Sequence, residues 1–250
     1  MQLQKLITLT VVLIMSWAIS TTAQELSALD IVKKMDAVVN APRDQKMSIT
    51  MTLVDKNGDQ KERKTEMYQK GDEMRLVRFL SPADQKGISF LSLPDDVMYL
   101  YLPAFRKVRR IASHVKNESF AGTDFSYDDL SSFKYSEEYN PKLLETTDEF
   151  YILELTPKPD VNKDYSKLKM WVRKDNFCPA KIEHYDKGGN LWKIMERLKI
   201  VKKGEYWVAL EMEMKDLKTQ HSTKSITETI ELDSGLSDDI FTQRNLKRVK

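Results

Sequence analysis

The chain is short of cysteine and histidine, and both shortages exclude kinds of protein. Its one cysteine, Cys178, cannot form a disulfide within the chain, and a domain of this length folds without one. The apolar residues beside Cys178 predict a small buried side chain. The three histidines, His114, His184 and His221, lack the spacing of metal ligands, so we expect no metal.

Enzyme signatures are also missing. There is no Gly-x-Ser-x-Gly nucleophile elbow, no phosphate-binding glycine loop and no HExxH helix. The adjacent acids Asp128-Asp129 and Asp238-Asp239 are candidate carboxylate pairs, but neighbouring acids point in different directions. We expect Asp128 or Asp129 to cap a short helix instead. The sequence therefore indicates a protein that is not an enzyme and has no cofactor.

Neither sign of charge is in excess. The chain has 40 Lys and Arg against 38 Asp and Glu, a formal net charge of +2. This balance excludes a nucleic-acid binder that relies on global charge. The basic run Arg106-Lys107-Val108-Arg109-Arg110 predicts either a strand with a solvated face or a docking patch for an acidic partner.

A long apolar run occurs only at the N-terminus, where it is typical of a signal peptide. Lys5 provides the positive start, residues 6–14 are mostly apolar, and Thr21-Thr22-Ala23 offers small residues for cleavage near Ala23. The run is shorter than the roughly 20 residues of a membrane span. We expect residues 1–23 to be a signal peptide and residues 24–250 one soluble periplasmic domain, because Cys178 is too far from the cleavage site to carry a lipid.

After this segment the sequence predicts one helix and then strands. Ser27 can cap a helix over residues 28–39, with Asp30 at the reciprocal position. Alternating apolar residues then predict about eleven or twelve strands. They span residues 47–53, 60–70, 75–80, 88–93, 97–102, 106–111, 150–156, 168–173, 180–185, 191–201, 206–214 and 225–232.

Short turns between most of these strands predict a mainly β (α+β) fold, a single antiparallel sheet with an N-terminal helix. A long open sheet tends to curl, which gives an open half-barrel with an apolar concave face. Charged residues such as Lys61 and Glu62 on the return strand after the turn at Asn57-Gly58 indicate a convex face in water.

Residues 112–130 follow no steady period, although aromatic residues recur in them. A loop this long in a compact domain is usually a lid or a binding loop. We expect it to form a short helical lid over the concavity, with Gly122 as a hinge. The candidate lid residues are Phe120, Gly122, Phe125, Tyr127 and Leu130.

Three stretches carry a family resemblance: residues 101–111 (YLPAFRKVRRI), 120–130 (FAGTDFSYDDL) and, more weakly, 239–246 (DIFTQRNL). Together with the signal peptide, the helix and the curled sheet, they resemble the LolA-like outer membrane lipoprotein-sorting proteins. The resemblance covers essentially the whole mature chain. It implies a half-barrel that carries acyl chains of lipids or lipoproteins between the inner and outer membranes, linked to an inner-membrane transporter of the resistance-nodulation-division (RND) type.

The resemblance also implies particular residues. The lipoprotein carrier has an arginine that gates its lid, and Arg75 and Arg78 are candidates for that role here. The candidate lipid contacts come instead from the strand alternation, which places them on the concave face: Met47, Ile49, Met51, Leu53, Met98, Leu100, Leu102, Leu153, Met170, Val208 and Met212. Methionine adapts to irregular apolar cargo, although it also fills gaps in an ordinary core. We expect a monomer that touches membrane surfaces transiently.

Two other functions are compatible with such a scaffold. The first is an envelope sensor or regulatory domain that recognises lipidated or misfolded envelope proteins. Such a domain would hold a stable partner, whereas a carrier would exchange its cargo. The second is a hydrolase, which the missing nucleophile and base disfavour.

Overall fold

The computed structural model describes residues 25–131 and 134–248, so the predicted signal peptide lies outside the described residues. The helices are α1 (Ala28–Val39), α2 (Tyr135–Glu138) and α3 (Gln243–Leu246), with 3-10 turns η1 (Pro103–Phe105) and η2 (Asp238–Phe241). The strands are β1 (Asp44–Val54), β2 (Gln60–Lys70), β3 (Met74–Ser81), β4 (Ser89–Leu93), β5 (Val97–Leu102), β6 (Lys107–Arg110), β7 (Tyr139–Thr146), β8 (Phe150–Pro157), β9 (Lys167–Arg173), β10 (Pro179–Tyr185), β11 (Leu191–Arg197), β12 (Ile200–Lys203), β13 (Tyr206–Ala209), β14 (Glu211–Asp216) and β15 (His221–Leu232).

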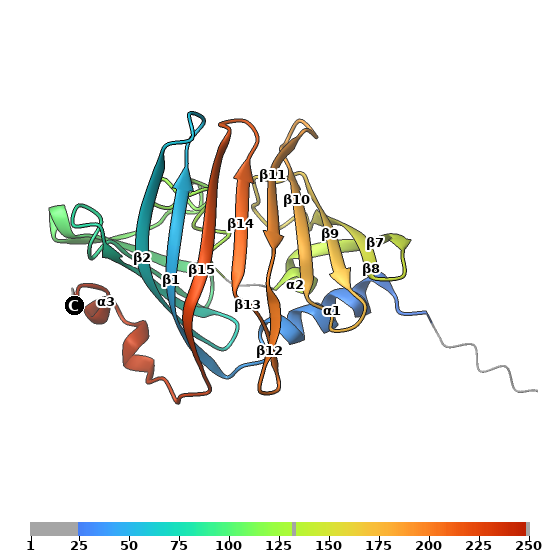
Figure 1. Ribbon diagram of the computed structural model, residues 1–250, viewed down its shortest axis with the longest axis horizontal. Helices are drawn as coiled ribbons and strands as arrows, with labels where there is room; N and C mark the ends of the chain where they lie inside the picture. The colour runs from blue at the N-terminus through green and yellow to red at the C-terminus, as the bar shows by residue number, and fades with distance from the viewer. Residues whose placement is uncertain (1–24, 132–133, 249–250) are drawn as a thin grey trace, which may run out of the picture.

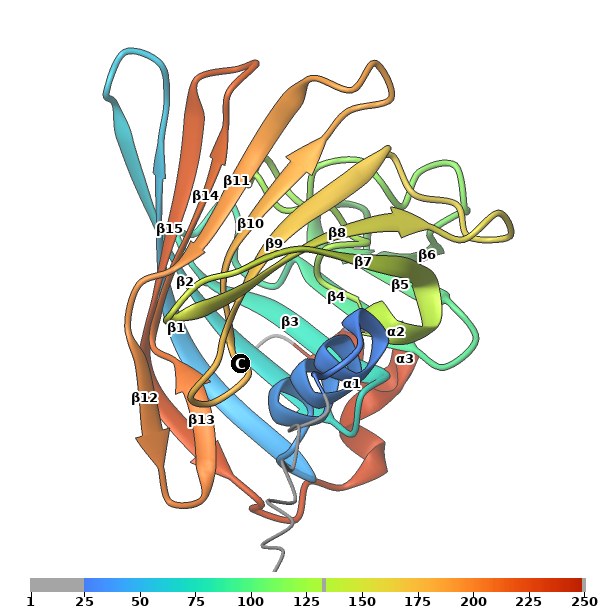
Figure 2. The ribbon, with the colours of Figure 1, turned by 90° about the vertical axis from the view of Figure 1, so that its right-hand side faces the viewer.

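Thirteen of these strands form one antiparallel sheet in the order β6-β5-β4-β3-β2-β1-β15-β14-β11-β10-β9-β8-β7. The sheet curls strongly, and β12 and β13 extend from it as a separate hairpin (Figures 1 and 2). The end strands β6 and β7 do not pair with each other in the described part of the chain. The predicted open half-barrel is therefore confirmed.

Helix α1 lies inside the curl of the sheet (Figure 2), as its apolar stripe requires. Ile31, Val32 and Met35 are fully buried against inward residues of β8 to β11. The predicted cap is confirmed, because the Ser27 hydroxyl oxygen accepts a hydrogen bond from the Asp30 backbone N–H at 3.1 Å. No helix among the described residues is long and apolar enough to cross a membrane.

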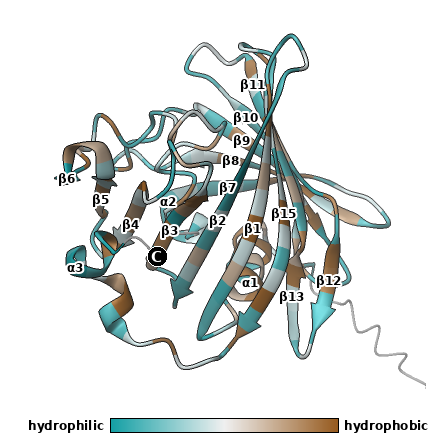
Figure 3. Cartoon of the chain, turned by 60° about the vertical axis from the view of Figure 1, so that its left-hand side comes forward, coloured by the Kyte–Doolittle hydropathy of each residue, from teal (hydrophilic) through white to brown (hydrophobic). Residues whose placement is uncertain are grey.

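The C-terminal segment packs on the outside of the half-barrel. Phe241 and Leu246 cover Leu76 and Leu91, which point outward from β3 and β4. Figure 3 shows this segment beside β3 and β4, outside the curl of the sheet. The sequence led us to expect a convex face in water. The C-terminal segment covers part of that face.

Two details of the strand pattern differ from the prediction. Strand β7 was not predicted, and it contains Pro141. Proline has no backbone N–H to donate, and an edge strand such as β7 tolerates this because one of its sides pairs with no described strand. The predicted strands 191–201 and 206–214 are each divided in two, because the chain leaves the main sheet after Arg197 and returns at Glu211. These changes bring the number of strands to fifteen.

Candidate functional site

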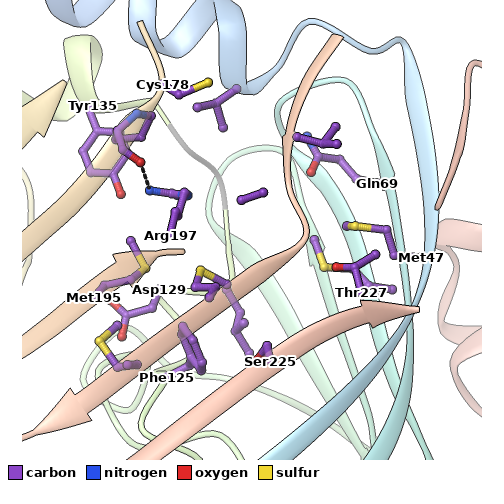
Figure 4. A pocket seen from close by; sticks show the side chains of 18 of the residues that line it. Met47, Gln69, Phe125, Asp129, Tyr135, Cys178, Met195, Arg197, Ser225 and Thr227 are labelled. Carbon is purple, nitrogen blue, oxygen red and sulfur yellow. Dashed lines mark hydrogen bonds between the residues drawn. The ribbon is translucent and has the colours of Figure 1, made fainter. Parts of the chain in front are cut away.

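A cavity of about 200 Å³ lies on the concave face between the end of α1, the loop before α2 and the β12–β13 hairpin. Its wall comes largely from the inward positions of β1, β11, β14 and β15, which alternate with outward ones as in any strand. Six of the chain's twelve methionines line it: Met47, Met51, Met67, Met195, Met212 and Met214. Figure 4 shows the cavity from close by, with Tyr135, Arg197 and Asp129 on the side away from Met47.

Five of the eleven predicted lipid contacts line this cavity, namely Met47, Ile49, Met51, Val208 and Met212. The other six do not. Leu153 and Met170 are fully buried beneath α1, and Leu53, Met98 and Leu100 pack around Phe120. Leu102 is half-buried at the end of β5. The strand period predicts the inward face, but α1 and the loop cover much of it.

The predicted lid residues divide between the cavity and the core. Phe125 and Leu130 line the cavity. Phe120 stacks on Phe79 with ring centroids 5.2 Å apart and meets Tyr127 at 5.7 Å. These rings are therefore buried as expected, although part of the loop completes the core.

Gly122 has the positive φ, +75°, that favours glycine at a tight turn. Its backbone does not border the main cavity. It lies instead beside a second hollow, which includes Asp124 and His221.

Polar contacts fasten this loop to the sheet. The Asp124 carboxylate accepts a hydrogen bond from the Thr223 hydroxyl at 2.6 Å and lies 2.7 Å from Nδ1 of His221. Nη1 of Arg63 donates to the Ala121 carbonyl oxygen at 2.5 Å. Arg63 belongs to the charged strand β2 yet points inward and is 8% exposed. Any movement of the loop must break these contacts.

The expected helix cap at Asp128 or Asp129 is wrong. Residues 127–130 form a turn rather than a helix, and Ser126 closes it. The Ser126 hydroxyl accepts from the Asp129 backbone N–H at 3.0 Å, and the Asp129 carboxylate accepts from the Ser126 N–H at 2.8 Å. Asp129 thus takes the reciprocal position and Ser126 the capping position.

Buried charges occupy one end of the cavity. Nζ of Lys163 lies 2.9 Å from the Asp128 carboxylate and 2.8 Å from that of Glu138. Burial by itself would lower the pKa of Lys163, but the two carboxylates outweigh it and raise that pKa, so the ammonium stays charged. Lys163 therefore joins the loop to α2 from the connection between β8 and β9.

A second cluster of polar side chains surrounds Asp129. The Tyr165 hydroxyl donates to its carboxylate at 3.1 Å, and Nζ of Lys193 lies 3.9 Å away. Burial would raise the pKa of Asp129, but Lys193, His184 and the Ser126 N–H hold it below its ordinary value. The carboxylate is therefore ionised in the wall of the cavity.

The His184 ring packs against the Tyr165 ring with centroids 4.6 Å apart and planes tilted by 57°, and His184 is 4% exposed. Burial is the main cause that lowers the pKa of His184 to about 4. Asp129 raises this pKa in part, and the positive charge of Lys193 lowers it further. The imidazole is therefore neutral at physiological pH.

The two arginines that the resemblance suggested point to opposite faces of β3. Arg75 is fully buried on the inner side, and its Nε donates to Gln69, which lines the cavity. Burial lowers the pKa of Arg75 to about 9. Arg78 lies on the outer side, where Nη2 donates to the Asn245 carbonyl oxygen of α3 at 2.7 Å. Only Arg75 therefore has a position from which it can act on the cavity.

Sequence reasoning missed the polar part of the wall, in particular Lys163, His184 and Arg197. Lys163 and His184 carry no local signal, because their partners are far away in the chain. Arg197 does carry one, since it follows Lys193 and Met195 at the inward phase of β11. A cation at an inward position of a predicted strand is unusual.

Cys178 is buried and lines the cavity, and burial raises the pKa of its thiol to about 11. It is therefore an unreactive thiol, in agreement with the small buried side chain that we predicted. Among the described residues, no group of three or more His, Cys, Asp or Glu side chains is arranged to hold a metal ion.

The chain is similar to several solved structures. A domain classed as an outer membrane lipoprotein-sorting protein, from Vibrio parahaemolyticus, is 31% identical over 88% of this chain and 98% of that one, with a TM-score of 0.82. A DUF1329 family protein from Desulfovibrio piger ATCC 29098 is 30% identical over 88% and 97%, with a TM-score of 0.82. A LolA superfamily protein from Nitrosomonas europaea is 22% identical over 88% and 99%, with a TM-score of 0.73, and shares the fold.

A family model described as an uncharacterized protein matches residues 71–248. No curated protein matches the chain. The matched residues include most of the sheet and the loop, and so most of the cavity wall.

We predict that His184 makes the folded protein less stable in mild acid. A histidine whose folded pKa lies near 4 favours folding fully above its unfolded pKa of about 6.5, and that contribution is lost as pH falls. Between pH 7.5 and 5 the free energy of unfolding should fall by about 2 kcal/mol through this group. Chemical denaturation at several pH values measures this change in the free energy of unfolding.

His184→Gln should flatten the pH dependence, and His114→Gln, at an exposed position, should not. Equal slopes for the wild type and His184→Gln would contradict the prediction.

Proposed function

The chain belongs to the family of outer membrane lipoprotein-sorting proteins and has a LolA-like fold, and from that premise we propose that it is a periplasmic carrier for acyl chains. It binds the chains of lipids or lipoproteins in the methionine-lined cavity and moves them between the inner and outer membranes. The observation that carries the proposal is a cavity lined by six methionines on the concave face of this fold. Protein cores are normally packed without such space, and methionines that line it can adapt to an apolar ligand.

The energetics of an acyl chain favour a cavity that is incompletely closed. Burying a chain of ~16 carbons at ~0.8 kcal/mol per methylene gives on the order of 12 kcal/mol. Binding of that strength would release cargo too slowly for a carrier. A cavity that leaves part of the chain in water, or a loop that must move on binding, lowers the net affinity.

The finer parts of the proposal concern location and partners. Export through a signal peptide cleaved near Ala23 would place the protein in the periplasm. There it acts as a monomer and receives cargo from an inner-membrane transporter of the RND type. The LolA-like fold is not an enzyme fold, and we propose no catalytic activity.

We predict that a charge in the methionine wall weakens lipid binding. Met47→Glu should reduce the affinity for a fluorescent fatty-acid probe at least about tenfold, because an unpaired carboxylate in an apolar site costs more than 1.4 kcal/mol. Ser48→Glu is the matched control, since the next residue of β1 faces the other side. Circular dichroism checks that both variants fold. Equal loss of affinity in both would reject this cavity as the lipid site.

We predict that residues 112–130 move when cargo enters. Hydrogen exchange should show them exchanging readily in the empty protein and gaining protection with lipid, while β5 stays protected throughout. The contacts of Asp124 and Arg63 provide the closed position. If exchange across the loop is slow and does not change with lipid, the loop is a static part of the core.

We propose that the membrane contact lies at the edge strand β6 and the turn before it. Phe105 is 62% exposed, and Arg106, Lys107, Arg109 and Arg110 around it are exposed. None of these four cations forms a salt bridge in the described part of the chain, and Arg109 instead lies over the Phe105 ring at 5.7 Å. An exposed ring among unpaired cations suits an anionic lipid surface.

This contact predicts a charge-dependent affinity for vesicles. The double variant Arg109→Ser, Arg110→Ser should bind phosphatidylglycerol-containing vesicles about thirtyfold more weakly, because each basic residue contributes about 1 kcal/mol there. Lys202→Ser, Lys203→Ser removes the same charge from the exposed end of β12 and should have little effect. Co-sedimentation measures both. Similar losses in the two variants would show a diffuse attraction without a defined patch.

A further inference from the structure

Three cationic side chains of the described residues line the cavity, and one of them has no acidic partner among those residues. Lys163 lies between Asp128 and Glu138, and Lys134 lies 2.7 Å from Glu73. Arg197 forms no salt bridge with any described residue. Its one hydrogen bond to a described residue runs from Nη1 to the Pro179 carbonyl oxygen at 3.1 Å.

The position of Arg197 places this cation beside the apolar wall. It is the last residue of β11, two positions after Met195, and it pairs across the sheet with Met212 of β14. Figure 4 shows its side chain projecting into the cavity between Tyr135 and the methionines. Charge and methionine wall therefore meet at one point of the same cavity.

A cation held in such a place without a counter-charge is costly. Arg197 is half-buried, so it bears part of the several-kcal/mol penalty for taking an ion out of water, and burial lowers its pKa. An arginine nevertheless stays protonated, and its planar fork carries five N–H donors. Most of them have no acceptor among the described residues.

A second group also points to a polar ligand. Ser225 of β15 lines the same cavity and is 5% exposed, and its hydroxyl has no hydrogen-bond partner among the described residues. Buried polar atoms in proteins are nearly always paired. The carboxylates of the wall do not supply the missing charge for Arg197, because Lys163 engages Asp128 and Glu138 while Tyr165 and Lys193 engage Asp129.

We propose that Arg197 binds the acidic head group of the cargo, so that the ligand is an anionic amphiphile. Its carboxylate or phosphate pairs with the guanidinium, and its acyl chain runs along the methionines. Arginine suits both anions because its fork binds two oxygens at once. This inference rests on the proposed carrier function and adds the chemistry of the head group to it.

The test compares single-chain ligands that differ only in the head group. Hexadecanoic acid, 1-palmitoyl lysophosphatidic acid and hexadecanol compete with a neutral fluorescent probe, below their micellar concentrations. The wild type should bind at least one of the two acids about tenfold or more tightly than the alcohol. Preference for the carboxylic acid alone points to free fatty acids as the source, and preference for the phosphate alone points to phospholipids or their derivatives.

Variants assign the preference to Arg197. Arg197→Met should bind acid and alcohol equally, with the affinity for the alcohol unchanged or higher, and its melting temperature should not fall, because an unpaired charge has gone. Arg197→Lys should keep part of the preference. Arg173→Met removes an exposed arginine that pairs with Asp175 and should behave as the wild type.

The outcomes separate this inference from the proposed function. If the wild type binds acids and alcohol equally well, the head-group site is wrong and the carrier function stands. A preference that survives in Arg197→Met would also overturn the assignment to this residue. If none of the three ligands binds, the carrier function fails and the head-group site fails with it.

Discussion

The protein depends on a sheet that curls but does not close. A twisted antiparallel sheet of thirteen strands bends on itself, and its concave face then carries apolar side chains that must be covered. A single helix of twelve residues covers one half, from β8 to β11, and the loop before α2 covers the other. The cavity is the space on this face that the two elements border but do not fill. The cavity therefore results from the way the helix and the loop cover the curled sheet.

The loop shows how one segment serves both stability and binding. Phe120 and Tyr127 complete a core with Phe79 and Phe90, whereas Phe125 and Leu130 form part of the cavity wall. Rings of this kind contribute about 1.5–3 kcal/mol each when buried, so the core half resists displacement. The contacts of Asp124 with Thr223 and His221 resist displacement less, because a carboxylate that leaves its partners is hydrated again. One segment therefore supplies both core packing and part of the cavity wall.

The buried charges at the other end of the cavity have a structural cause. Lys163, Asp128 and Glu138 come from three separate segments that no strand pairing joins, and a buried ion pair is retained only when its partners are well placed. The triad therefore fixes where the loop and α2 meet. Arg197 departs from this pattern, because no acid among the described residues forms a salt bridge with it.

Several parts of this structure follow from the sequence alone. The alternation of Met47, Ile49 and Met51 with polar residues predicts a strand with one apolar face, and Ser27 with Asp30 predicts the start of α1, because both depend on neighbours within a few residues. Strand alternation also predicts which side chains point inward. Local signals are weaker where the chain is an edge, as in β7 with Pro141, or where a hairpin leaves the sheet, as at β12 and β13.

Only the tertiary structure decides which inward residues meet a ligand. Leu153 and Met47 have the same period and similar chemistry, but α1 lies over the first and leaves the second exposed to the cavity. The partners of Lys163 and the missing partner of Arg197 are equally invisible in the sequence. Strand period is a property of consecutive residues, whereas covering a face and pairing a charge depend on segments that are brought together by folding.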